Sequence, residues 1–206
     1  MKIRGLVAVA LAAAAMAPVA SAHAQQGTGR RTGLPNADQP VIRSWPQPTL
    51  SVEGGAGIIG FVGGAASLGP AWNVRVSGAI SDRFVLEGNY VGGLSERADT
   101  GDSLVMTALD AGGRYNILLP DQSPVVPFVG AGIGYAGFAG RYGDAATLIV
   151  PVNGGVERML TQNIKVGARF SFRPAFFDDL GTDLPGSRGE PGADTWSLLA
   201  QVGGGF

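Results

Sequence analysis

The stretch Ile164-Lys165-Val166-Gly167-Ala168-Arg169-Phe170-Ser171-Phe172-Arg173-Pro174 decides the fold of this chain. Every second residue from Ile164 to Phe172 is apolar, and the residues between them are charged or small. Successive side chains of a β-strand point to opposite faces, so this period of two predicts a strand with one apolar and one polar face. A helix would spread both sets of residues around its axis, and we therefore exclude it here.

From Leu50 onward the chain repeats this pattern in segments that are separated by turn residues. We predict strands at about 50–60, 71–80, 83–92, 104–117, 126–137, 146–157, 163–174 and 195–206. The connections alternate between a shorter set, such as Ser81-Asp82, and a longer set that is rich in Gly, Asp and Pro. An even number of strands with short turns at one end and long loops at the other predicts an all-β, eight-stranded antiparallel up-and-down barrel.

The composition favours a transmembrane barrel over a water-soluble one. Charged residues make up only 15% of the chain, and Lys165 is its only lysine after Lys2. A water-facing β-protein normally covers its outside with charged residues. The aromatic residues of the predicted strands also fall at two levels, as the two interfaces of a bilayer require. One level holds Trp72, Tyr90, Tyr135, Phe172 and Trp196, and the other holds Phe84, Tyr115 and Phe206. Periodicity alone does not say which face is inside, so a soluble lipocalin-like ligand-binding barrel is the competing interpretation.

The N-terminal residues predict export. Residues 1–24 read as a signal peptide, with Lys2 and Arg4 before an apolar run and Ala22-His23-Ala24 as the cleavage site. Residues 25–48 are polar and rich in proline, which predicts a disordered periplasmic leader, and residues 49–206 form the predicted barrel. The chain has no cysteine, which excludes disulfides and thiolate metal sites. Basic residues are not in excess, so we expect no nucleic-acid partner.

The polar face of the predicted strands carries charged residues that a barrel would enclose. The set contains four acidic and five basic side chains: Glu53, Arg75, Glu87, Asp110, Arg114, Glu157, Lys165, Arg169 and Arg173. Buried charges must pair or they cost several kcal/mol each. We interpret the set as a salt-bridged interior that closes the lumen, because side chains fill a barrel of eight strands. The alternative interpretation is a narrow or gated pore for small solutes.

Two stretches resemble the OmpA-like family of small eight-stranded outer-membrane barrels. Pro127-Phe128-Val129-Gly130-Ala131-Gly132-Ile133-Gly134-Tyr135 is similar to the family's fifth-strand motif. Asn153-Gly154-Gly155-Val156-Glu157, followed by Asn163 to Phe172, is similar to its sixth-to-seventh hairpin. The final Phe206 is similar to the terminal aromatic that serves the family as an assembly signal, although Gly204 stands where an aromatic or aliphatic residue is usual. The resemblance implies the cell outer membrane of a Gram-negative bacterium, contact with outer-membrane lipid and lipopolysaccharide, and insertion by the barrel assembly machinery.

We expect a structural or surface-interaction role and no enzyme activity. The only histidine, His23, lies in the predicted signal peptide, so the barrel lacks the usual base of a Ser–His or Asp–His site. We accordingly expect no catalytic residue, no cofactor and no metal site. The acidic loop at 175–194 could hold Ca²⁺ or Mg²⁺, but its spacing matches no EF-hand. Loops 93–103 and 175–194 are the predicted contact sites for a surface partner, and the barrel is expected to be monomeric or weakly self-associating.

Overall fold

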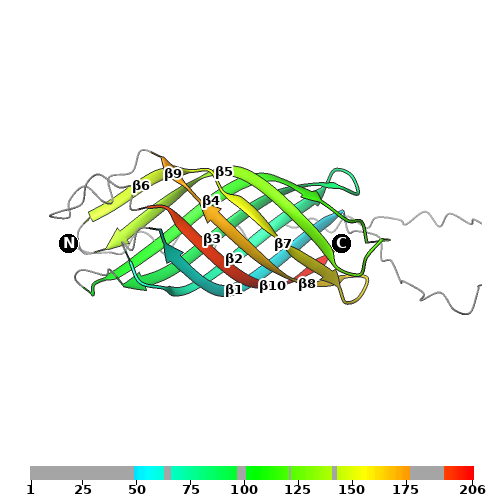
Figure 1. Cartoon of the computed structure of the whole chain (residues 1–206), viewed down its shortest axis with the longest axis horizontal. Helices are drawn as coiled ribbons and strands as arrows, with labels where there is room; N and C mark the ends of the chain where they lie inside the picture. The colour runs from blue at the N-terminus through cyan, green and yellow to red at the C-terminus, as the bar shows by residue number, and fades with distance from the viewer. Residues whose placement is uncertain (1–48, 63–65, 97–100, 121, 141–142, 177–192) are drawn as a thin grey trace, which may run out of the picture. The chain divides into compact units, whose positions relative to one another are not determined.

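The computed structural model describes residues 49–62, 66–96, 101–120, 122–140, 143–176 and 193–206. The predicted signal peptide and leader lie outside these ranges. The described residues form ten β-strands: β1 (Leu50–Phe61), β2 (Gly69–Ala79), β3 (Phe84–Glu96), β4 (Ser103–Asn116), β5 (Val126–Gly140), β6 (Gly143–Ile149), β7 (Val152–Met159), β8 (Ile164–Arg173), β9 (Ala175–Phe176) and β10 (Thr195–Gly205). All neighbouring strands are antiparallel, and pairing of β1 with β10 and of β4 with β5 closes the sheet into a barrel (Figure 1). The part of the chain that the structure describes contains no helix long and apolar enough to cross a membrane.

Two prolines divide two of the barrel strands, which is why ten strands make an eight-stranded barrel. The register of β5 continues from β6 to β7 without a shift, and Gly132 donates to the carbonyl of Pro151 between them at 2.9 Å. Pro174 separates β8 from β9 in the same way, and its carbonyl accepts from Val150 at 3.2 Å. Proline has no N–H group, so it interrupts the ladder without changing the path of the strand. The predicted fold class is confirmed.

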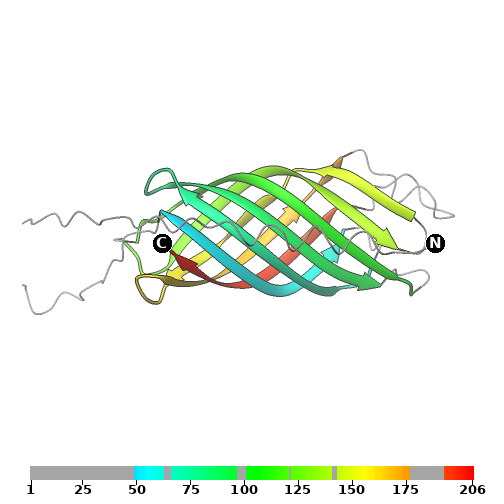
Figure 2. The same cartoon turned by 180° about the vertical axis from the view of Figure 1, so that it is seen from behind.

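The two ends of the barrel differ. At one end Leu50 and Phe206 exchange two backbone hydrogen bonds, of 3.3 and 2.8 Å, and the connections β2–β3, β4–β5 and β7–β8 turn back there. We call this end the terminal rim; Figure 2 shows the start of β1 beside the C-terminus. The opposite end, where β1 finishes at Phe61 and β2 begins at Gly69, is called the loop rim. The β2–β3 and β7–β8 connections at the terminal rim have four residues each, whereas eighteen residues connect β9 to β10 at the loop rim. Short turns are typical of the periplasmic end of a membrane barrel.

Two predicted loops are shorter than the sequence indicated. Between the strands predicted at 126–137 and 146–157, β5 continues to Gly140 and β6 begins at Gly143, which pairs with it. We predicted a loop at 93–103, whereas β3 continues to Glu96 and pairs there with Ser103 at the start of β4. Gly92 and Gly93 lie within β3, and Gly92 makes room for an aromatic ring. A Cβ atom at Gly92 would collide with the ring of Trp72 on β2, so glycine lets the indole lie flat on the strand. Residues 97–100 lie outside the described ranges.

The outer wall is apolar and the inner face carries the charges. Aliphatic side chains on every part of the wall are exposed, among them Val74, Leu86, Leu109, Ile133 and Val202. The aromatic levels lie on this wall as well: Phe84 packs edge-on against Tyr115 at 5.1 Å, and Phe170 stacks on Trp196 at 6.4 Å. A soluble monomer does not expose a continuous apolar surface of this extent. The soluble lipocalin-like alternative is therefore wrong, because it required these aliphatic side chains to be inside.

The interior has two halves of different chemistry. The half next to the terminal rim is polar and holds most of the predicted charges, whereas Arg173 is buried at the loop-rim end of β8, opposite Thr195. The half next to the loop rim holds a set of buried apolar side chains that the sequence analysis did not identify, and we call this set the apolar plug. Its members are Ile59, Phe61, Ala66, Ala71, Val91, Leu104, Met106, Ala108, Ala136, Phe138, Ile149, Ala193 and Leu199. The polar side chains of Ser95, Thr147 and Thr195 are buried at the same level.

The apolar outer wall predicts how charged substitutions will depend on depth. Ile133 is 58% exposed at the middle of β5, whereas Ile117 follows the end of β4 just beyond Tyr115. Arginine in place of a lipid-facing residue costs about 2–4 kcal/mol at the bilayer midplane and about 0–1 kcal/mol near the interface. We expect Ile133→Arg to lower the free energy of unfolding in vesicles by the larger amount and Ile117→Arg by the smaller. Equal losses, measured by urea titration, would contradict the membrane position of this wall.

Candidate functional site: the charged lumen

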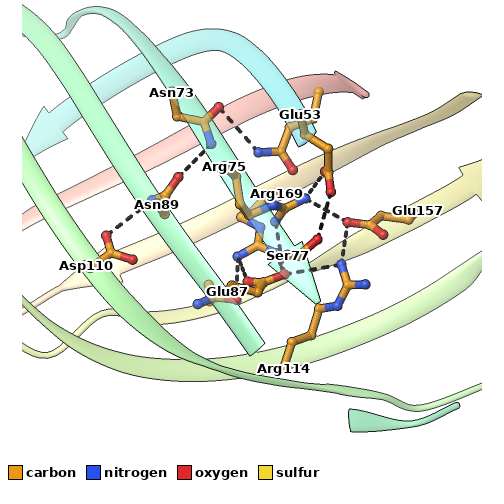
Figure 3. A network of polar contacts seen from close by, with 12 residues as sticks. Glu53, Asn73, Arg75, Ser77, Glu87, Asn89, Asp110, Arg114, Glu157 and Arg169 are labelled. Atoms are coloured by element: carbon orange, nitrogen blue, oxygen red, sulfur yellow. Dashed lines mark hydrogen bonds and ion pairs between the residues drawn. The ribbon is translucent and has the colours of Figure 1, made fainter. Parts of the chain in front are cut away.

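All nine charged residues singled out in the sequence lie on the inner face of the barrel. They come from β1, β2, β3, β4, β7 and β8, and each side chain is at most 11% exposed. Strand alternation explains the arrangement, because Glu53, Arg75 and Glu87 occupy inward positions of neighbouring strands and Glu53 stands opposite Arg75 in the register. Figure 3 shows most of these side chains pointing towards one another, namely Glu53, Arg75, Glu87, Arg114, Glu157 and Arg169.

Arg75 is the centre of the network. Its guanidinium is fully buried and contacts three carboxylates, with Glu53 in direct ion contact, Glu157 at 2.8 Å and Glu87 at 3.4 Å. Glu157 lies on β7, which is four strands away from β2 in a closed sheet of eight. The Arg75–Glu157 pair therefore joins opposite walls of the barrel.

A second bridge crosses the lumen in another direction. Arg169 on β8 donates from both terminal nitrogens to Glu87 on β3, at 2.8 Å each, and from one of them to Asn153 at 3.0 Å. This two-pronged geometry matches the planar guanidinium to the carboxylate and is the strong form of the pair. Arg114 contacts the same Glu87 at 3.4 Å and donates to Glu157 at 2.5 Å. The three glutamates are thus each shared by more than one cation.

Phe128 supports two of these guanidinium groups. Its buried ring lies 4.9 Å from the guanidinium carbon of Arg114 and 4.7 Å from that of Arg169. A cation over an aromatic ring gains about 0.5–2 kcal/mol when water is excluded. Gly155 provides the space for the ring, because a Cβ atom there would lie 2.7 Å from its edge. The sequence analysis missed Phe128, although it has the same strand parity as the inward Gly130 and Gly132.

Lys165 completes the network near the terminal rim. Its ammonium group is in direct ion contact with Glu53 and lies 3.5 Å from Glu157. The hydroxyl groups of Ser51 and Ser77 contact the same glutamate. Their oxygens are 2.7 Å apart, and each donates to Oε1 of Glu53, at 3.4 and 3.5 Å. We call the seven residues Glu53, Arg75, Glu87, Arg114, Glu157, Lys165 and Arg169 the lumen cluster.

Asp110 and Arg173 lie apart from this cluster, towards the apolar plug. Their closest oxygen and nitrogen are 4.0 Å apart, and Arg173 also donates to Ser197 at 2.8 Å. Amide side chains continue the polar chain from there: Asn89 donates to Asp110 at 3.2 Å and accepts from Asn73 at 2.9 Å. Gln201 donates to Asn73 at 3.4 Å. Polar contacts therefore line the lumen up to the plug.

The apolar plug also joins opposite walls. The rings of Phe61 on β1 and Phe138 on β5 are 6.1 Å apart, and these strands are four positions apart in the closed sheet. Ile59, Ile149 and Leu199 around them are at most 1% exposed. These side chains pack against one another like the core of a soluble domain.

Several predicted features fall outside what the structure describes. Most of loop 175–194 is among the undescribed residues, so neither a partner surface nor a cation site there can be placed. Within the described ranges, no group of three His, Cys, Asp or Glu side chains gathers as a metal site would require. Phe206, the predicted assembly signal, lies at the terminal rim with 76% of its surface exposed, and its N–H donates to Leu50.

Comparison with solved structures identifies the fold. The structure of Neisserial surface protein A (NspA) matches with a TM-score of 0.60 and 16% identity, and the match covers 77% of this chain and 97% of that protein. The outer membrane protein OprG from Pseudomonas aeruginosa matches with a TM-score of 0.56 and 11% identity, over 79% and 98% of the two chains. No protein-family model matches the sequence, and no curated protein matches it.

The closed eight-stranded sheet, its apolar outer wall and its two aromatic levels define a small outer-membrane β-barrel. The predicted location in the cell outer membrane is confirmed by this fold and its neighbours. The structural match to NspA and OprG shows the architecture alone, because the sequence identity is low. The role of the lumen is therefore argued from the side chains described above.

Removing one carboxylate from the lumen cluster should destabilise the barrel. Glu87 contacts Arg75, Arg114 and Arg169, and breaking a buried ion pair on one side costs on the order of 3 kcal/mol. Glu96, an exposed residue on the same strand β3, provides the matched control. We expect Glu87→Gln to lower the free energy of unfolding by about that amount and Glu96→Gln to change it by less than about 0.5 kcal/mol. Similar values for the two variants in a urea titration would show that the cluster does not stabilise the fold.

Proposed function

We propose that this protein is a non-conducting outer-membrane barrel that acts as a rigid structural element and presents its loops for surface interaction. The observation that carries the proposal is the contact of Phe61 with Phe138 across the lumen, within a set of buried apolar side chains. An apolar constriction resists wetting, and an ion would lose its hydration shell there without gaining ligands. The lumen is therefore blocked on the loop-rim side.

The ion pairs of the other half support the same proposal. Arg75, Arg114 and Arg169 are engaged with carboxylates that lie on other strands, including the two pairs that cross the lumen. A solute passing through would have to separate these buried pairs, each of which costs several kcal/mol to break. The cluster ties the walls together, and this favours a rigid barrel over a pore.

The proposed role places the interactions of the protein on its outside. The apolar wall would contact lipid and lipopolysaccharide, Phe206 would serve the assembly machinery, and loops 93–103 and 175–194 would meet surface partners. Catalysis has no part in the proposal. The barrel contains no histidine, and the buried glutamates of the lumen cluster are occupied by cations.

A narrow pore for small solutes is the second candidate. Its support is the polar lining, which extends from Lys165 near the terminal rim through the amides of Asn73 and Asn89 to Asp110 and Arg173. This lining ends at the apolar plug, so conduction would require the plug to move. Electrical measurement separates the two candidates.

The proposal predicts the conductance of the barrel and of a plug variant. The wild-type protein in planar bilayers should show no single-channel steps, because the plug has no hydrated path. The double variant Phe61→Ser/Phe138→Ser should produce steps or raised leakage, since it replaces the apolar contact with small polar groups. Phe84→Ser, on the outer wall, is the control and should stay silent. Reproducible wild-type conductance that changes when Arg169 or Glu157 is neutralised would establish the pore instead.

A further inference from the structure

A small cavity opens at the terminal rim next to the lumen cluster. Its volume is about 30 Å³, which holds a water molecule or a single ion of similar size. Pro120, Val126 and Met159 contribute apolar walls. The charged groups that line it are Arg114, Lys165 and Glu157 from the cluster and Arg158 at the exposed edge, with the hydroxyls of Ser51 and Ser77. We call this space the terminal cavity.

The lumen cluster carries one positive charge more than its carboxylates balance. It contains three glutamates and four cations, and Asp110 lies outside it as the partner of Arg173. Among the described residues, no carboxylate besides these three glutamates is within ion-pair distance of the four cations, and an excess charge in a barrel interior is costly. A mobile counter-ion is the simplest way to balance it.

The terminal cavity reaches the cluster at two of its four cations. Arg114 and Lys165 both line the cavity, whereas Arg75 is fully buried and Arg169 pairs with Glu87 through both of its terminal nitrogens. Three of the four charged side chains around the cavity are cations. The two serine hydroxyls can donate to an anion once they release Glu53, which Lys165 and Arg75 also hold.

We propose that the terminal cavity binds one halide-sized anion, such as chloride, with Lys165 and Arg114 as its cationic ligands. The ion balances the charge of the lumen cluster from the periplasmic side. The site is a dead end, since the apolar plug lies beyond the polar half.

The test uses the full-length mature barrel folded in a zwitterionic detergent and measures the chloride-35 NMR line width. Chloride in exchange with a protein site gives a line broader than free chloride. We expect excess broadening with the wild type, and we expect bromide but not gluconate to abolish it at constant ionic strength. Lys165→Met and Arg114→Met should each reduce the excess at least fivefold, whereas Lys165→Arg should keep it. Arg83→Gln removes a cation at the terminal rim that does not line the cavity, and it should leave the broadening unchanged.

Four results would overturn the proposal. The first two concern the wild type: no excess broadening of the chloride line, or broadening that gluconate removes as well as bromide does. The other two concern variants: broadening that persists in folded Lys165→Met, or that appears only in Asp121→Asn. Asp121 follows Pro120 in the sequence and lies outside the described residues, so the last result would make the chain's own carboxylate the balancing charge. If neither methionine variant folds, the urea midpoint of the wild type decides. It must rise and saturate as chloride replaces gluconate at constant ionic strength, and a midpoint that does not change rejects the site.

Discussion

Closure of the hydrogen-bonded sheet is the constraint on which the rest of this structure depends. A backbone inside a bilayer has no water to bond, so every N–H and C=O group must find its partner within the protein. The pairing of β1 with β10 and of β4 with β5 removes the free edges. Once the sheet is closed, each strand has one face towards lipid and one towards a narrow interior. The alternation of Ile164 to Arg173 then has only one arrangement that satisfies both solvents, with the aliphatic residues outside.

The enclosed charges follow from the same closure. Eight strands leave an interior that side chains fill, so a guanidinium such as that of Arg75 cannot reach bulk water and must be paired in place. Burial of ion pairs seldom stabilises a fold more than apolar packing of the same volume would. Their contribution here is geometric: Arg75–Glu157 and Arg169–Glu87 each fix the separation of opposite walls. The Phe61–Phe138 contact does the same for the other half with apolar groups.

The sequence predicts the features that depend only on the two-residue repeat of a β-strand and on which face each residue occupies. Strand positions, the outer wall and the inward direction of the nine charged residues follow from alternation within single segments. The contacts between them do not, because Arg75 and Glu157 are 82 residues apart and meet only through the stagger of several non-adjacent strands. The apolar plug was missed for a related reason. Ile59 and Phe138 occupy strand positions whose side chains point inward. In a membrane barrel, however, apolar residues are expected on the lipid face. Only the register of the strands shows that the inner positions near the loop rim are apolar too.

The division of the interior into a polar and an apolar half gives the barrel a direction. The loops emerge above the apolar plug, so a partner binding them would meet a rim that is packed as tightly as a soluble core. The charged half faces the opposite side, where Lys165 and Arg114 line a cavity at the terminal rim. A change of charge at that rim therefore acts on the ion pairs of the lumen cluster, and the plug lies between those pairs and the loops. Phe61 and Phe138 fix the walls around the plug, so the loops are carried by a close-packed and rigid end of the barrel.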